Sequence, residues 1–156
     1  MKVIFLDFDG VLNSEMFFVG LDRKNCEKAF PESELSEELI SNLNFIIEET
    51  GANVVVSSTW RHGRSVAELQ RLLETAGFKG KVIDKTPDFL HNTTIPRGIE
   101  IEGWLKKNSV ESFVIIDDDD DMLENQVDNF LQTSFVFGIT HGIALQAIEI
   151  LNERIH

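Results

Sequence analysis

The sequence predicts an α/β fold, a doubly wound (Rossmann-like) and mostly parallel sheet of about five strands. Two observations predict it. Short apolar runs of strand length, such as 3–6 and 113–116, alternate with stretches whose apolar residues recur at helical spacing. Several of these runs end abruptly in polar residues, as a buried parallel strand does where it enters a loop. Strands that alternate with helices favour a parallel sheet covered by helices.

The individual elements follow the chain in order. Ser36, followed by two glutamates, predicts a capped helix start, and Gly51 predicts the end of that helix. Thr140 is expected to cap the last helix. Strands are expected at 3–6, 53–56, 81–84, 113–116 and 130–133. Further helices are expected from 66 to a stop at 77 and from 97 to about 108, with a short helix or turn at 122–128.

The segment 14–34 interrupts this alternation. It has no clear period, and it mixes the apolar run 16–19 with charged residues and Pro31. We expect an irregular flap or short hairpin, too short to be a cap domain, which either covers a substrate or packs on the core. The polar stretch 85–96 is expected to be an exposed loop. The chain 1–156 is therefore predicted to be one domain without a large cap.

Composition restricts the class of protein. With 42% hydrophobic and 26% charged residues the chain is typical of a globular domain. It has no membrane-spanning run and no signal-peptide pattern, so we expect a cytoplasmic protein without a membrane partner; a monomer is compatible with the sequence. Cys26 is the single cysteine, which excludes an internal disulfide. The net charge of −13 argues against strong non-specific binding to nucleic acid, but not against a phosphorylated substrate.

Polar side chains follow three predicted strands: Asp7 and Asp9, Ser57 and Ser58, and Asp117 and Asp118. The carboxyl ends of parallel strands meet at one edge of a sheet, so these residues are expected to share one crevice. Unpaired carboxylates about 4 Å apart repel by roughly 4 kcal/mol at an effective dielectric of about 20. A shared proton or a cation would relieve this repulsion, and Mg²⁺ is the natural candidate for oxygen ligands.

The string Asp7-Phe8-Asp9-Gly10-Val11 resembles the first motif of the haloacid dehalogenase-like (HAD) phosphotransferases. The resemblance implies that Asp7 is a nucleophile that becomes an aspartyl phosphate and that Asp9 is a general acid and base. It also implies a Mg²⁺ site formed by Asp7, Asp9, Asp117 and Asp118, with Asp9 contributing its main-chain carbonyl.

The same resemblance implies a phosphate-binding hydroxyl after the second strand and a cation before the Asp117 strand. Ser57 is the first hydroxyl of its strand end and our choice, with Ser58 as the alternative; Ser57 could also merely cap the next turn. The family usually has a lysine as the cation. Here Lys85 and Arg97 both remain candidates, and we favour Arg97 because a guanidinium at a helix start can bind two phosphoryl oxygens.

A finer pattern is similar to the small HAD domains found in multi-domain RNA repair proteins. It comprises 57–61, the pair 97–98, the acids after 116 and a late Gly138-Ile139-Thr140. By this resemblance Arg61 would bind a second phosphate. Trp60 would either stack a base or belong to the core.

The function that the resemblance implies is Mg²⁺-dependent hydrolysis of a phosphomonoester through an aspartyl phosphate. The substrate would be a phosphorylated small molecule, a nucleotide or a nucleic-acid end. Two alternatives stay open. One is a receiver-like domain that accepts phosphate on aspartate, and the other is a catalytically weak module that binds phosphate or metal.

Overall fold

The structure, a computed structural model, describes residues 1–24, 34–88 and 95–153, without the side chains of 21–24. Its elements are β1 (Lys2–Leu6), α1 (Glu15–Lys24), α2 (Glu37–Thr50), β2 (Asn53–Val56), η2 (Thr59–Arg61), α3 (Val66–Thr75), β3 (Val82–Lys85), α4 (Arg97–Leu105), β4 (Ser112–Asp117), η3 (Glu124–Asn129), β5 (Phe130–Gln132) and α5 (His141–Asn152). The predicted alternation of strands and helices is confirmed.

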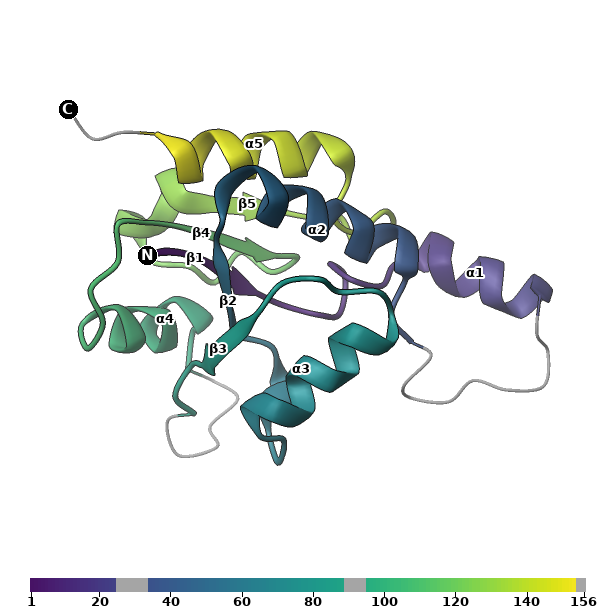
Figure 1. Cartoon of the computed structure of the whole chain (residues 1–156), viewed down its shortest axis with the longest axis horizontal. Coiled ribbons are helices and arrows are strands. Elements are labelled where there is room, and N and C mark those ends of the chain that lie inside the picture. Colours follow the sequence, from purple (N-terminus) through teal and green to yellow (C-terminus); the bar gives the residue numbers. More distant parts are fainter. Residues whose placement is uncertain (25–33, 89–94, 154–156) are drawn as a thin grey trace.

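The strands form one five-stranded sheet in the order β3-β2-β1-β4-β5, and every neighbouring pair is parallel. Strand β1 lies in the centre, between β2 and β4, with helices around the sheet (Figure 1). The chain runs outward from β1 to β3, then returns to the other side of β1 for β4. The sheet therefore has a topological switch point beside β1, where α/β folds bind their ligands.

Two apolar clusters show that helices cover both faces of the sheet. Alternate strand residues point to opposite faces, and here they divide between the clusters. On one face, α2, α3 and α5 pack on Ile4, Leu6, Val54, Val56, Val114 and Ile116. On the other face, Ile101 and Trp104 of α4 pack on Val3, Phe5, Val55 and Ile115. Burial of each such large side chain stabilises the fold by roughly 1.5–3 kcal/mol.

The helix caps read from the sequence are confirmed. Ser36 Oγ accepts a hydrogen bond from the Leu39 N–H at 3.2 Å, and Thr140 Oγ1 accepts one from the Ile143 N–H at 3.2 Å. Gly51 ends α2 in the left-handed conformation, with φ of 70°. These caps fix where α2 and α5 begin, and the two helices lie side by side on one face of the sheet (Figure 1).

The prediction of an irregular flap or hairpin from residue 14 is wrong for residues 15–24, which form helix α1. Ser14 Oγ accepts from the Phe17 N–H at 3.1 Å and supports the first turn. The Glu15 and Met16 N–H groups donate to the carbonyls of Phe135 and Val136 at 2.9 and 3.2 Å. The free main-chain N–H groups at the start of this helix are thus bonded by a segment far along the chain. A local sequence pattern cannot reveal such bonds. Residues 25–33 of the predicted flap, including Cys26, lie outside the described residues.

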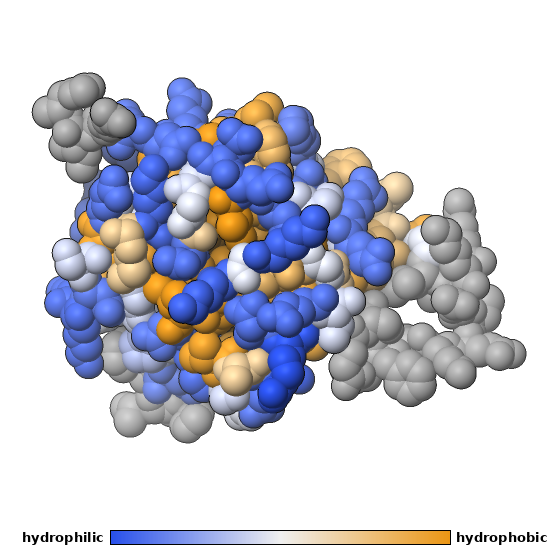
Figure 2. All heavy atoms as spheres, in the orientation of Figure 1, coloured by the Kyte–Doolittle hydropathy of each residue, from blue (hydrophilic) through white to orange (hydrophobic). Residues whose placement is uncertain are grey.

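Within the described residues the sheet and its helices account for the fold, and they include no large cap domain. No helix in this part of the chain combines the length and apolar character that crossing a membrane requires. Figure 2 shows hydrophilic side chains over most of one face, with apolar ones gathered in its middle, over β2 and β3.

Candidate active site

Strand register brings Asp7, Ser57 and Asp117 together. Leu6 of β1 pairs with Val56 of β2 and with Ile116 of β4, so the residues that follow form one row. Main-chain hydrogen bonds continue the ladder into this row, from Asp7 N–H to the Ile116 carbonyl at 3.1 Å and from Ser57 N–H to the Leu6 carbonyl at 3.0 Å. All three side chains are buried.

Three carboxylates meet at this row. Oxygen atoms of Asp7, Asp117 and Asp118 all lie within 4.8 Å of one another. Gly10 makes the approach of Asp118 possible: its φ is 76°, and a Cβ there would overlap Asp118 Oδ2. Gln132 Nε2 donates to the Asp118 carbonyl at 3.0 Å and holds the loop after β4. The acid cluster is thus fixed by the turn after β1 and by β5.

Burial and mutual repulsion perturb two of these acids. Burial raises the pKa of Asp117 to about 9, and the negative charge of Asp7 adds to the shift. Burial likewise raises the pKa of Asp7, to about 6, although the Arg97 guanidinium opposes this shift. Near neutral pH, ionisation of both side chains at once is unfavourable unless a bound cation neutralises part of their charge.

The acid cluster fits a hard divalent cation. Asp117 Oδ2 is buried, and it accepts no hydrogen bond from the described residues. Its cationic neighbour, Arg97 Nε, is 3.9 Å away. An all-oxygen set of acidic ligands suits Mg²⁺ or a similar ion better than a soft metal. Asp7, Asp117 and Asp118 would hold such an ion.

Asp9 is placed differently from the other acids. Its side chain is exposed, outside the group of three carboxylates. Asn13 Nδ2 donates to Asp9 Oδ1 at 3.0 Å, and Trp60 Nε1 donates to Asp9 Oδ2 at 2.9 Å. Asn13 is not predictable from the sequence as a partner of Asp9, since its only signal is its place four residues after that aspartate.

The two serines after β2 have different environments. Ser58 Oγ accepts from the Trp60 N–H at 3.2 Å and caps η2. Ser57 Oγ is buried, and no described residue bonds to it. The turn is therefore capped by Ser58, which leaves the Ser57 hydroxyl available to a ligand.

The two candidate cations for phosphate binding, Lys85 and Arg97, also have different environments. Lys85 Nζ donates to the carbonyls of Arg61 and Arg64, at 3.2 and 2.8 Å. Arg97 lies beside Asp117, and its buried Nη1 has no hydrogen-bond partner among the described residues. The main-chain N–H of Arg97 donates to Asp121 Oδ2 at 2.9 Å. Asp121, from the same aspartate run, thus caps α4, whose N-cap residue is a proline.

Arg61, predicted to bind a second phosphate, is buried and engaged within the protein. Its Nη2 forms an ion pair with Glu100 Oε2 at 2.7 Å. Its other N–H groups donate to the main-chain carbonyls of Ser57, Ser58, Thr86 and Pro87. A guanidinium has five N–H groups, so all of them are used. A phosphate contact by Arg61 would have to replace one of these bonds.

The central parallel sheet, the acids after β1 and the acids after β4 define an α/β domain of the haloacid dehalogenase-like class. The family model described as the HAD domain in Swiss Army Knife RNA repair proteins matches residues 3–143, and the chain belongs to this family. No significant match was found among curated proteins or among solved structures. Family membership supports a hydrolase activity of the phosphatase type in general.

The raised pKa values predict how a divalent cation, if bound at the acid cluster, would change the stability of the protein. Without a metal, the folded protein binds more protons than the unfolded chain between the ordinary carboxyl range and about pH 9, so its free energy of unfolding falls as pH rises through this range. A bound cation favours the ionised acids and offsets this loss. We expect Mg²⁺ to raise Tm by several degrees more at about pH 8 than at about pH 5.5.

Differential scanning fluorimetry with Mg²⁺ or with a chelator measures this difference. The control is Asp117→Asn, which keeps the shape of the side chain and removes the acid with the higher pKa. An equal Mg²⁺ effect at both pH values, or an Asp117→Asn variant that responds like the native protein, would contradict the metal assignment.

Proposed function

We propose that this protein is a Mg²⁺-dependent phosphomonoesterase that works through a phosphorylated Asp7. The observation that carries the proposal is a set of three buried polar atoms, Ser57 Oγ, Arg97 Nη1 and Asp117 Oδ2. Ser57 and Asp117 belong to the row of strand ends, and Arg97 lies beside Asp117. None of the three atoms has a hydrogen-bond partner in the described part of the chain. Burying such atoms unpaired is costly, so these three residues suit the binding of a charged ligand.

The chemistry of the atoms matches a phosphoryl group beside a cation. A hydroxyl and a guanidinium donate to phosphoryl oxygens, and a carboxylate oxygen accepts a metal. Asp7, Asp117, Asp118 and the main-chain carbonyl of Asp9 would hold Mg²⁺. When bound, the ion would neutralise negative charge on the acids and the phosphoryl group.

The proposed reaction has two steps. First, an Asp7 carboxylate oxygen attacks phosphorus, the bond from phosphorus to the ester oxygen breaks, and Asp9 donates a proton to the departing oxygen. In the second step Asp9 takes a proton from water, whose oxygen attacks phosphorus and releases Asp7 as a carboxylate with inorganic phosphate. Ser57 and Arg97 orient the phosphoryl group throughout.

The family description supports a nucleic-acid end or a nucleotide as the phosphorylated substrate. The described residues contain no large cap that would enclose a small molecule, which favours a phosphate presented on something larger. The net charge of −13 would make affinity for a long polyanion low and dependent on salt. We further propose that the chain acts as one domain and that it works in the cytoplasm.

Substitutions of the two acids after β1 test the reaction. Asp7→Asn removes the attacking carboxylate and should abolish phosphate release from a generic phosphomonoester with Mg²⁺. Asp9→Asn should retain Mg²⁺ affinity and slow turnover by roughly 10²–10⁴-fold, the usual value of a positioned general acid and base. Phosphate release by protein free of contaminating phosphatases is the measurement.

Turnover by Asp7→Asn at the native rate would refute the proposed nucleophile. A native protein that takes up one phosphate and then stops would indicate a receiver-like domain instead. Mg²⁺ binding without any transfer would indicate a binding module.

A second comparison decides between Arg97 and Lys85. Arg97→Ala removes the guanidinium beside Asp117 and should lower kcat/KM by about 10²-fold, with partial recovery in Arg97→Lys. Lys85→Ala is the matched control, because its ammonium binds main-chain carbonyls of the loop after β2. It should lower Tm while leaving kcat/KM within about threefold. The reverse ranking would assign the phosphate-binding role to Lys85.

A further inference from the structure

The carboxylate of Asp9 is exposed, yet both of its oxygens are bound. Asn13 Nδ2 lies 3.0 Å from Oδ1, and Trp60 Nε1 lies 2.9 Å from Oδ2. An exposed aspartate on a turn ordinarily exchanges rotamers in water. Here one donor on each oxygen favours a single rotamer. Each carboxylate oxygen has two acceptor positions, so the bonds from the described residues leave one position on each oxygen unused.

The Trp60 donor is itself held in place. Arg64 lies over the indole ring, with its guanidinium carbon 5.6 Å from the ring centroid, and Phe8 packs against the ring with centroids 5.4 Å apart. The main-chain N–H of Trp60 donates to Ser58 Oγ, and Arg64 Nη1 donates to the main-chain carbonyl of Trp60 at 3.1 Å. These contacts occupy the ring and orient its N–H edge, which argues against a role for Trp60 as a base-stacking platform.

The Asn13 donor is oriented by the turn after β1. Asn13 is fully buried, and its Oδ1 accepts from the Gly10 N–H at 2.9 Å. A main-chain N–H can only donate, so the carbonyl end of the amide must face Gly10 and the NH₂ end must face Asp9. The turn that carries Asp9 therefore also fixes the group that orients it.

We infer that Trp60 and Asn13 are positioning residues that hold the Asp9 carboxylate for proton transfer to the ester oxygen. The inference rests on the proposed function. Proton transfer requires one carboxyl oxygen within hydrogen-bond reach of the departing oxygen, and a freely rotating side chain meets that condition only part of the time. Both donors are neutral, so they fix the geometry of Asp9 without adding charge to the site.

Trp60→Phe tests the inference because it keeps an aromatic ring between Phe8 and Arg64 and removes the Nε1 donor. We expect kcat to fall about tenfold, with KM and Mg²⁺ affinity unchanged. Asn13→Asp keeps an acceptor for the Gly10 N–H but sets a carboxylate against Asp9, and its kcat should fall further. In an Asp9→Ala background, which has no carboxylate to orient, Trp60→Phe should have no additional effect on kcat.

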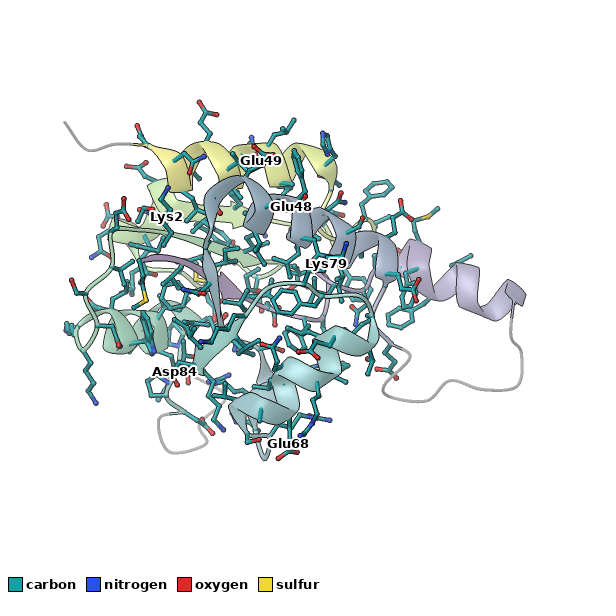
Figure 3. The ribbon with its side chains drawn as sticks, in the orientation of Figure 1. Lys2, Glu48, Glu49, Glu68, Lys79 and Asp84 are labelled. Carbon is teal, nitrogen blue, oxygen red and sulfur yellow. The ribbon has the colours of Figure 1, made fainter. Side chains whose placement is uncertain are left out.

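Trp104→Phe is the matched control. Trp104 Nε1 also donates to a carboxylate, Asp84 Oδ2, at 2.8 Å. This pair joins α4 to β3, where Figure 3 labels Asp84, and the Trp104 ring packs edge-on against Phe5 in the core. Loss of this second indole donor should lower Tm and leave kcat unchanged.

A spectroscopic measurement tests the contact without turnover. The chain has two tryptophans, so a ¹⁵N–¹H spectrum has two indole signals. Asp9→Ala should shift the Trp60 signal and leave the Trp104 signal in place; two unshifted signals would overturn the contact. A native protein that turns over no phosphomonoester would overturn the proposed function and, with it, this role for the contact. If the native protein is active but Trp60→Phe does not lower kcat, the positioning role alone is overturned. The same conclusion follows if Trp60→Phe lowers kcat by the same factor with Asp9 as in the Asp9→Ala background.

Discussion

The site depends on the register of three parallel strands. Pairing of Leu6 with Val56 and Ile116 sets Asp7, Ser57 and Asp117 in one buried row. These strands are apolar on both faces, and a shift by one residue would move a polar residue such as Asp7 or Ser57 into the packed part of the sheet. The core that fixes the register therefore also fixes the row. The fold thereby holds two acids where burial and mutual repulsion raise their pKa values.

Much of the surrounding structure accommodates this concentration of acids. Arg97 places a positive charge beside Asp117, and Asp121 caps the helix that carries Arg97. Gly10 leaves room for Asp118. Arg61 and Glu100 join the loop after β2 to α4 through a buried ion pair. Removing one partner of such a pair ordinarily costs about 3–5 kcal/mol, so the pair stabilises the contact between this loop and α4.

The sequence was sufficient to predict features that depend only on residues close together in the chain. Asp7 and Asp117 directly follow apolar strands, and Ser36 and Thr140 cap helices that begin beside them. Helix α1 could not be predicted, since its first N–H groups bond to carbonyls far along the chain. The engagement of Arg61 and the partners of Asp9 likewise depend on how separate elements meet. The sequence, by its resemblance to the RNA repair domains, predicts a phosphate contact for Arg61 and leaves Trp60 either as a base-stacking residue or as part of the core.

Identification of the phosphorylated residue tests the central claim most directly. The native protein would be mixed with an excess of a rapidly hydrolysed phosphomonoester and Mg²⁺, quenched in acid within milliseconds, digested at low pH and analysed by mass spectrometry. An acyl phosphate is stable enough in cold acid for this measurement, and hydroxylamine should remove it. The account predicts one phosphate on Asp7 in the peptide that contains β1. Phosphate on Asp117, on Asp118 or on no residue during steady turnover would contradict it.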